Sequence, residues 1–307
     1  MVKKISIILI VALNFVLAQK VSVKSTETIQ LKNSGEAFYP KFTKDDSGII
    51  FTSSNYKGLS LYNFATKREE VITTEQGAGF RPQIMADNIV YRKFDFVNKL
   101  KYFTVKNYNI ENKTAKVLIK NKRTLKLPNQ IVTSKILLVE DSVPQMIKVS
   151  EKSLQKASLP NIALLIEGDD LLLIENERKT KLNPLGEGAY VWASLSNDGT
   201  KILFTFGTQG AFVCDLNGNV ILNVKEAHYP KFSPDDKFIS YMIDKDDGHV
   251  FTSSDIFIYS IDDKESFRIT DTDNKIEMYP EWSNSGDKLV YNTTQGELII
   301  SELEIKK

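Results

Sequence analysis

The feature that most constrains the fold is a short pattern that occurs five times along the chain. In each copy a proline or alanine lies between two large side chains, and a turn-forming pair and an alternating apolar segment follow. The clear copies are HYPKFSPDDKFISY (228–241), FYPKFTKDDSGIIF (38–51), MYPEWSNSGDKLVY (278–291) and VWASLSNDGTKILF (191–204), and FRPQIMADNIVY (80–91) is a degenerate one. A pattern that returns after about forty residues predicts a row of equivalent structural units.

Each unit has the composition of an antiparallel sheet. Asp-Asp, Asp-Gly and Ser-Gly pairs favour tight turns. Segments such as KILF (201–204) and KLVY (288–291) alternate as half-buried strands do. Further strand-like segments follow, and no long amphipathic helical pattern separates the copies. Four antiparallel strands per unit predict an all-β fold, a single β-propeller of four-stranded blades.

The number of blades depends on the least regular part of the sequence. The aligned anchor residues of the five copies are Pro40, Pro82, Ala193, Pro230 and Pro280. The stretch between the second and third anchors is long enough for at least two units. Taking Pro128 as a sixth anchor gives six blades, one with an extra hairpin, and this is the number we prefer. Seven blades are possible if Pro160 is also an anchor.

The two ends of the repeat region complement each other. The last unit ends near Ile305 after three strands, and residues 26–31 (TETIQL) precede the first anchor without a unit of their own. We expect this N-terminal strand to complete the last blade and close the ring, which removes the exposed sheet edges.

The N-terminus has the pattern of a secretory signal peptide. Lys3 and Lys4 precede an apolar run that ends in Val16-Leu17-Ala18, and such a run is too short for a membrane span, which needs about twenty residues. We expect cleavage after Ala18, a periplasmic or secreted protein, and one propeller domain over residues 19–307 without a membrane span. An N-terminal anchor helix is the alternative reading of the same run.

Charge and cysteine content limit the classes of partner. With 40 basic and 39 acidic residues among 307, the chain gives no electrostatic reason to expect nucleic acid. The single cysteine, Cys214, lies in a strand-like run, where a small core residue is expected rather than a nucleophile. We expect a monomer that holds no cofactor.

The repeat resembles that of a known family. YPKFSPDD, YPEWSNSGDK and LSNDGTKILF are similar to the P-x-W-S-P-D-G repeat of TolB-like propellers, and DKDDGHVFTSSDI resembles a stretch of exported TolB-like proteins of Bacteroidetes-type bacteria. The resemblance implies a propeller that binds other cell-envelope proteins. TolB itself has an additional N-terminal domain, for which the stretch between Gln19 and Tyr39 is too short.

The candidate site is the loop that contains DKDDGH. Residues 244–254 lie between two predicted strands of one blade, on the face where propellers commonly bind their ligands. Both histidines of the chain fall on this blade. The residues that we expect to form a ligand site on this face are His228, Asp244, Asp246, Asp247, His249, Asp255, Glu277 and Arg81.

Three interpretations of this loop remain open. A divalent cation would suit Asp244, Asp246 and Asp255 at calcium-loop spacing, but His249 stands where that loop requires glycine. A solvated loop with local turns is the simplest alternative. A polar-ligand or protein-contact site is the third.

Two functions follow from these features. No catalytic motif such as Gly-x-Ser-x-Gly is present, and we expect a protein that is not an enzyme and binds an envelope protein, a glycan or another small polar ligand. The alternative is a carbohydrate-active or metal-dependent lyase or glycosidase that uses carboxylates and histidines at the mouth of the propeller. We expect the repeated aromatics Tyr39, Trp192, Tyr229, Tyr279 and Trp282 to pack between blades rather than to form a sugar-binding surface.

Overall fold

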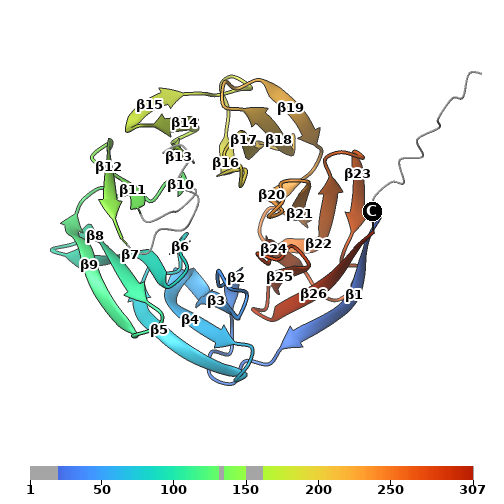
Figure 1. Ribbon diagram of the computed structural model, residues 1–307, viewed down its shortest axis with the longest axis horizontal. Helices are drawn as coiled ribbons and strands as arrows, with labels where there is room; N and C mark the ends of the chain where they lie inside the picture. Colours follow the sequence, from blue (N-terminus) through green and yellow to red (C-terminus); the bar gives the residue numbers. More distant parts are fainter. Residues whose placement is uncertain (1–19, 131–134, 150–161, 307) are drawn as a thin grey trace, which may run out of the picture.

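Seven antiparallel sheets surround a central axis in the computed structural model, which describes residues 20–130, 135–149 and 162–306 (Figure 1). Six sheets have four strands and one has two. The only helical segment among the described residues is the short 3-10 turn η1 (Ser54–Tyr56). The all-β propeller with six four-stranded blades is therefore confirmed.

The blades follow one another in chain order. The first blade contains β2 (Phe38–Phe42), β3 (Gly48–Ser53), β4 (Lys57–Asn63) and β5 (Arg68–Gln76), and the second β6 (Gln83–Ile84), β7 (Asn88–Val97), β8 (Leu100–Asn109) and β9 (Thr114–Lys122). The third contains β10 (Asn129–Gln130), β13 (Ile162–Glu167), β14 (Asp170–Glu175) and β15 (Arg178–Lys181), and the fourth β16 (Tyr190–Leu195), β17 (Lys201–Phe206), β18 (Ala211–Asp215) and β19 (Val220–Val224). The fifth contains β20 (His228–Phe232), β21 (Phe238–Asp246), β22 (Phe251–Ser260) and β23 (Glu265–Arg268), and the sixth β24 (Glu277–Trp282), β25 (Lys288–Thr293), β26 (Leu298–Lys306) and β1 (Lys20–Ile29).

The ring is closed by the two ends of the described chain. β1 pairs with β26 in antiparallel register, from Lys20 opposite Lys306 to Ile29 opposite Leu298. Figure 1 shows the two strands side by side at the edge of the sixth blade. The predicted closure is confirmed, and the closing strand begins earlier than the expected residues 26–31.

The extra hairpin occupies a place of its own in the ring. β11 (Lys135–Glu140) and β12 (Val143–Lys148) form the two-stranded sheet. On one side Ile136 and Leu138 pack in a cluster with Val90 and Val105 of the second blade. On the other side Leu137 and Val139 pack in a cluster with residues of β13 and β14. The hairpin is thus buried on both faces between two blades, which explains its apolar sequence.

The large residue two positions after each anchor packs between the sheets. Phe42, Leu195, Phe232 and Trp282 are 6–8% exposed and belong to the clusters that join neighbouring blades. Cys214 is fully buried in such a cluster, and burial raises the pKa of its thiol to about 12. The prediction that Cys214 is a core residue is confirmed.

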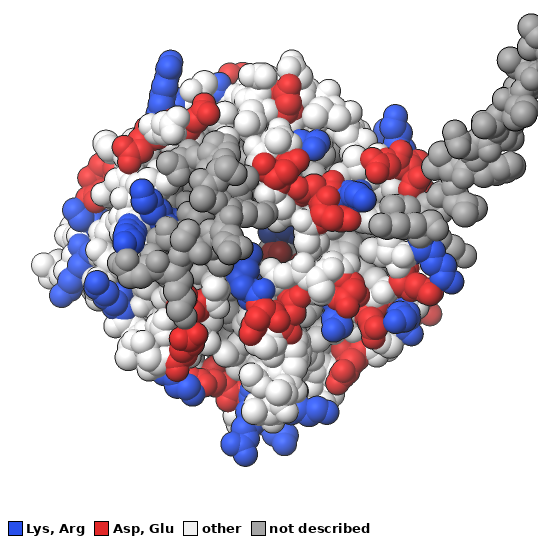
Figure 2. Space-filling model, in the orientation of Figure 1, with Lys and Arg blue, Asp and Glu red and all other residues white. Residues whose placement is uncertain are grey.

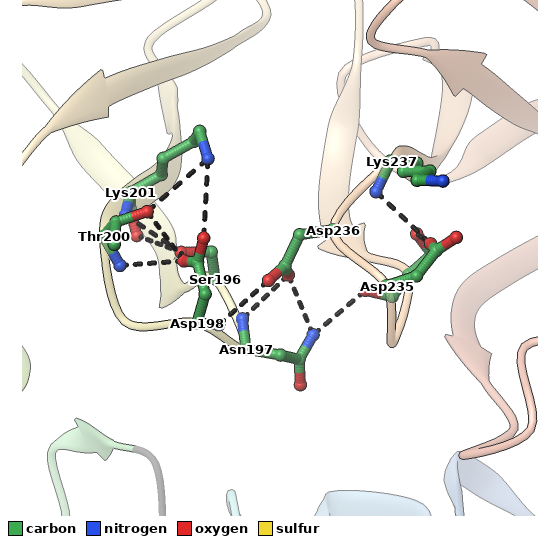
Figure 3. A network of polar contacts seen from close by, with 9 residues as sticks. Ser196, Asn197, Asp198, Thr200, Lys201, Asp235, Asp236 and Lys237 are labelled. Atoms are coloured by element: carbon green, nitrogen blue, oxygen red, sulfur yellow. Dashed lines mark hydrogen bonds and ion pairs between the residues drawn. The ribbon is translucent and has the colours of Figure 1, made fainter. Parts of the chain in front are cut away.

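Neighbouring blades are also joined by a hydrogen-bonded contact between their turns (Figure 3). The main-chain N–H and the side-chain amide of Asn197 donate to Asp236 Oδ1 at 2.7 and 2.9 Å, and the N–H of Asp198 donates to Asp236 Oδ2 at 2.9 Å. The sixth and first blades have the same arrangement. Asn284 and Ser285 donate three hydrogen bonds to Asp46 at 2.7 to 2.8 Å.

Two expectations concern residues that the structure does not describe. The predicted signal peptide, with its cleavage after Ala18, and the seventh anchor, Pro160, both lie outside the described residues. Within the described part of the chain, no helix is long and apolar enough to cross a membrane.

Candidate functional site

The residue before each anchor has an unusual backbone conformation. Tyr39, Arg81, Trp192, Tyr229 and Tyr279 have φ angles of 49° to 60°, a region that residues with side chains rarely adopt. In four of these blades the pairing of the inner strand shifts by a residue at this point. In these four blades the residue therefore forms a β-bulge, and its side chain leaves the alternation of the strand; Arg81 shares the backbone conformation just before the short strand β6.

These bulged residues line a central cavity of about 320 Å³ together with Tyr56 and Phe80. Their rings contact one another from blade to blade. The centroid of Tyr39 lies 4.9 Å from that of Tyr56 and 4.4 Å from that of Tyr279. The ring of Tyr229 lies 5.0 Å from Tyr279 and 6.0 Å from Trp192. The result is an aromatic wall that runs without a gap from Trp192 to Tyr56 along one side of the cavity.

The aromatic wall corrects one expectation from the sequence in part. Of the five repeated aromatics, Trp282 is buried between sheets at 8% exposure, and the partly buried Tyr229 and Tyr279 pack against the same cluster. Tyr39, Trp192, Tyr229 and Tyr279 also line the cavity. The reason is the bulge, which turns each of these side chains toward the axis.

The residue after each anchor forms a polar ring further along the axis. These six residues, one from the innermost strand of each blade, line an adjoining cavity of about 290 Å³: Lys41, Gln83, Asn129, Ser194, Lys231 and Glu281. Figure 2 shows the hollow at the centre of the molecule, with basic and acidic side chains around it.

Two of these polar residues, Lys231 and Lys41, share the carboxylate of a third, Glu281. Lys231 Nζ lies 2.9 Å from Glu281 Oε1, and Lys41 Nζ lies 3.9 Å from the same oxygen. The hydroxyl of Tyr229 donates to it at 3.3 Å. Burial lowers the pKa of Lys41 to about 8, and the positive charges of Lys231 and Arg81 act in the same direction. Burial disfavours the charged form of Glu281, but Lys231 and Lys41 outweigh it and hold its pKa below the usual value.

The aromatic cavity has a positive electrostatic character. Its described lining includes Lys41, Arg81 and Lys231 and no acidic side chain. Arg81 is exposed at the rim, with its guanidinium 5.5 Å from the centre of the Phe80 ring. No carboxylate among the described residues forms an ion pair with Arg81. Since Glu281 neutralises at most one of the three cations, the cavity suits an anion.

The structure brings two of the sequence-predicted residues into direct contact. His228 Nδ1 lies 2.6 Å from Asp244 Oδ1, and the two side chains are 26% and 8% exposed. The hydrogen bond to Asp244 raises the pKa of His228, against a smaller opposing effect of burial. The His228 ring lies 5.8 Å from the ring of Trp192, so this pair adjoins the aromatic wall.

The rest of DKDDGH lies elsewhere, because the predicted loop is a hairpin. β21 and β22 continue as a paired ladder to Asp246 opposite Phe251, so only residues 247–250 form the turn. Asp246 and Asp247 accept hydrogen bonds from the main-chain N–H groups of Gly248 and His249, at 2.8 and 2.9 Å. None of Asp246, Asp247 and His249 is in the lining of the central cavity. The expectation of an eleven-residue loop is therefore wrong, and these side chains serve the turn.

Asp255 and Glu277 are held by separate partners. Asp255 accepts a hydrogen bond from Arg268 at 2.7 Å. Glu277 is 1% exposed, and its Oε1 accepts a hydrogen bond from Thr272 at 2.7 Å. Its Oε2 has no partner among the described residues, and burial raises the pKa of this carboxyl. Within the described ranges, no group of three or more His, Cys, Asp or Glu side chains is arranged to hold a metal ion.

Sequence reasoning found Arg81 and missed most of the cavity. Lys41, Lys231, Glu281 and the bulged aromatics were not among the predicted site residues. The aligned repeat contained a usable signal, because the residue after the anchor is polar in every aligned copy, and in four of the five copies it lies between two buried positions. A polar residue that recurs at such a position indicates a lined channel.

Comparison with known proteins gives similarities among solved structures alone. No family model matches the sequence, and no curated protein matches it either. Among solved structures, the chain is similar to an oligogalacturonate lyase from Vibrio parahaemolyticus, with 9% identity, a TM-score of 0.48, and coverage of 87% of this chain and 78% of that one. A structure of oligogalacturonate lyase in complex with manganese gives 12% identity, a TM-score of 0.47, and coverage of 88% and 78%. The six-bladed propeller itself is established by the sheet topology.

The comparison also corrects an expectation about activity. We expected a protein that is not an enzyme, and both of these similar structures are lyases. The expectation of a non-enzymatic protein is therefore contradicted and is not retained. The resemblance to TolB-like propellers stays a prediction, while the six-bladed propeller expected from the repeat is established.

Proposed function

We propose that the central cavity binds an anionic carbohydrate, in which a sugar ring carries a carboxylate. The observation that supports this proposal is the combination of an aromatic wall with Lys41, Arg81 and Lys231 in one cavity. Aromatic faces offer apolar surface to the C–H groups of a sugar ring. Guanidinium and ammonium groups form charge-assisted hydrogen bonds with a carboxylate.

The size and polarity of the cavity fit such a ligand. A volume of about 320 Å³ lies within the range of small-molecule sites, about 300 to 1,000 Å³. Gln83 and Asn129 also line it and offer hydrogen bonds to hydroxyl groups. A neutral ligand would leave Lys41 and Lys231 to share the single carboxylate of Glu281 and would give Arg81 no anion.

Calorimetric titration with glucuronate and glucose tests the proposal. We expect the protein to bind glucuronate more tightly than glucose, and Arg81→Gln to weaken glucuronate binding about tenfold or more, because a hydrogen bond to a charged group contributes about 1.5–3 kcal/mol. Trp192→Ala should weaken binding through lost ring contact. Arg123→Gln is the matched control, since Arg123 lies over the Tyr102 ring outside this cavity. Equal heats for the two sugars, or binding unchanged in Arg81→Gln, would show the proposal to be wrong.

A second candidate function is catalysis on the bound ligand, and the environment of Lys41 favours it. With a pKa lowered to about 8, this amine is partly neutral near physiological pH and can act as a general base. In an elimination, Lys41 would take the proton on the carbon next to the carboxylate. A carbon–carbon double bond forms, and the neighbouring carbon–oxygen bond breaks with its electron pair leaving on oxygen. Lys231 or Arg81 would stabilise the negative charge that develops on the carboxylate.

This reaction has a direct readout. A polyuronate incubated with the protein should gain the ultraviolet absorbance of an unsaturated uronate, with a rate that rises as the pH passes about 8. Lys41→Met should abolish the signal, and it should weaken glucuronate binding less than Arg81→Gln does, because Lys41 is partly neutral near pH 8. Absence of product at every pH would eliminate catalysis of this kind and leave the binding proposal intact.

We also propose that the protein is exported and is a TolB-like propeller, on the strength of the N-terminal pattern and the repeat. Mass spectrometry of the protein from the periplasm or medium should give a chain that begins at Gln19. A chain that keeps residues 1–18 would instead support the N-terminal anchor.

A further inference from the structure

The hairpin that joins β7 and β8 has an exposed apolar tip. Its turn contains Asn98 and Lys99, with φ angles of 50° and 65°, as in the tight turns that match the twist of a hairpin. Three apolar side chains flank the turn: Phe96, Val97 and Leu100 are 66%, 53% and 47% exposed. They are among the most exposed large apolar residues of the described chain.

These side chains lie on both faces of the hairpin. Val97 pairs with Leu100, and Phe96 pairs with Lys101 one step further from the turn. Because successive residue pairs of a ladder point to opposite faces, Phe96 lies on one face and the Val97–Leu100 pair on the other. A hairpin that packed on the propeller core would need apolar side chains on one face only. This tip is apolar on both faces, and it therefore suits insertion into an apolar environment that contacts it from all sides.

The apolar tip is surrounded by positive charge. Lys99 lies in the turn itself, and Lys101 Nζ is 3.7 Å from the centre of the Phe94 ring. Arg123, just beyond the end of β9, lies over the Tyr102 ring at 5.1 Å. The nearest acidic residue of the hairpin, Asp95, is bound to Lys93 at 2.7 Å. The tip therefore combines exposed apolar side chains with a net positive charge.

We propose that this hairpin tip docks on a membrane surface that contains anionic lipids. Phe96, Val97 and Leu100 enter the interfacial region, while Lys99, Lys101 and Arg123 contact the lipid phosphates. Apolar side chains beside lysine and arginine are the usual composition of segments that lie in a membrane interface. Basic residues near such a surface are attracted by its negative potential. The proposal does not depend on the ligand of the central cavity.

Docking of the hairpin tip would also place the aromatic cavity relative to the membrane. Arg92, in the same strand as the tip, lies 5.5 Å from the centre of the Phe80 ring. Phe80, Arg81, Arg92 and Trp192 line a further cavity of about 430 Å³, and Phe80, Arg81 and Trp192 also line the aromatic one. A docked tip would hold the rim of the candidate site close to the lipid surface.

Vesicle sedimentation tests the proposal with the full folded chain lacking residues 1–18 and with vesicles of phosphatidylcholine alone or mixed with phosphatidylglycerol. We expect binding to the mixed vesicles, at least tenfold weaker binding to the neutral ones, and loss of binding at high salt. The double variant Phe96→Ser and Leu100→Ser should bind at least tenfold more weakly. Lys99→Gln with Lys101→Gln should reduce binding to the mixed vesicles only.

Val117→Ser is the matched control, because Val117 is 45% exposed in β9 of the same blade, opposite Lys106 and away from the tip. It should bind as the unmodified protein does. Far-ultraviolet circular dichroism and thermal unfolding verify that each variant is folded. Binding that is equal on both kinds of vesicle, absent from both, or unchanged in the tip variants overturns the proposal. Tip variants that change the oligomeric state in sedimentation velocity, without changing vesicle binding, would assign the tip to contact with a second copy.

Discussion

Asn284 in the sixth blade donates its side-chain amide to Asp46 in the first blade at 2.7 Å, and Asn197 makes the same contact with Asp236 between the fourth and fifth blades at 2.9 Å. Between the fifth and sixth blades the pair is different. Pro234 stands in the asparagine position and Gly286 in the aspartate position, and a Cβ at Gly286 would lie 3.6 Å from Pro234. Since proline has no N–H to donate, a carboxylate at position 286 would lack its donors. The turns of neighbouring blades thus use one of two residue pairs at these positions, asparagine with aspartate or proline with glycine.

The Asn284–Asp46 contact should stabilise the closure of the ring. Asn284→Ala should lower the free energy of unfolding by about 1–3 kcal/mol, because the charged carboxylate of Asp46 would lose its side-chain amide donor. A double-mutant cycle with Asp46→Asn, measured by denaturant unfolding, should show a coupling of at least about 0.5 kcal/mol. Asn284→Ala combined with Asp236→Asn should be additive, since these residues belong to separate contacts. Additivity in both cycles would contradict a stabilising role.

The left-handed conformation of the bulged residues predicts an unusual preference for glycine over valine. Arg81 has a φ of 52° and is exposed, so its replacement disturbs little packing. Arg81→Val should be less stable than Arg81→Gly by about 1–2 kcal/mol, because a Cβ is disfavoured in this conformation. At Lys116, an exposed residue of β9 outside the left-handed region, the order should reverse, because valine favours strands. The same order at both positions in thermal unfolding would refute the assigned backbone strain.

The repeat predicted the fold well because every copy has the same pattern of apolar strand residues and turn residues. The alternating segments and the large residues two positions after the anchors, such as Phe42 and Phe232, are buried between blades as expected. The turn aspartates Asp45 and Asp235 accept hydrogen bonds from neighbouring hydroxyls, as their sequence context predicts. The following aspartates, Asp46 and Asp236, bind the preceding blade in the ring instead. Sequence does not show that difference, because both positions are typical of turns.

The site was harder to predict because it depends on side-chain direction. Tyr39 and Tyr229 have the composition of core residues, and only the bulge turns them to the axis. The DKDDGH stretch has polar side chains on both faces of its hairpin, so the sequence lacks the alternation of apolar and polar residues that is typical of a strand. Without that alternation, the paired ends of the two strands are predicted as a loop. Of the two histidines, His228 adjoins the aromatic wall and His249 lies in a turn.

The His228–Asp244 pair predicts a stability that depends on pH. The pKa of His228 is raised above 6.5 in the folded state, mainly by the hydrogen bond to Asp244. The stabilisation from protonated His228 is therefore fully present below pH 6.5 and is lost as the pH rises through the folded pKa. The stability difference between the unmodified protein and His228→Gln should decrease over that range. His249→Gln, altered in the exposed turn, is the control and should give a nearly constant difference.

Replacing the buried carboxyl of Glu277 should stabilise the protein, whereas replacing His228 should destabilise it. Burial raises the folded-state pKa of Glu277 above 4.5, and its Oε2 has no hydrogen-bond partner among the described residues. The folded state therefore holds this proton more tightly than the unfolded state, and stability is lost as the pH rises from 4.5 through the folded pKa. Glu277→Gln removes the ionisation and keeps an oxygen that accepts from Thr272. The variant should be more stable than the unmodified protein at neutral pH, and this advantage should disappear in acid.

Urea unfolding at a series of pH values measures the effect. Glu265→Gln is the matched control, because Glu265 is exposed in β23, and its stability difference should not change with pH over this range. A Glu277→Gln variant that is less stable at neutral pH would mean that the charged carboxylate has a favourable partner. In that case Glu277, the first residue of β24, would become a candidate ligand-binding group. A buried carboxylate stabilises the protein only when a cation lies close to it.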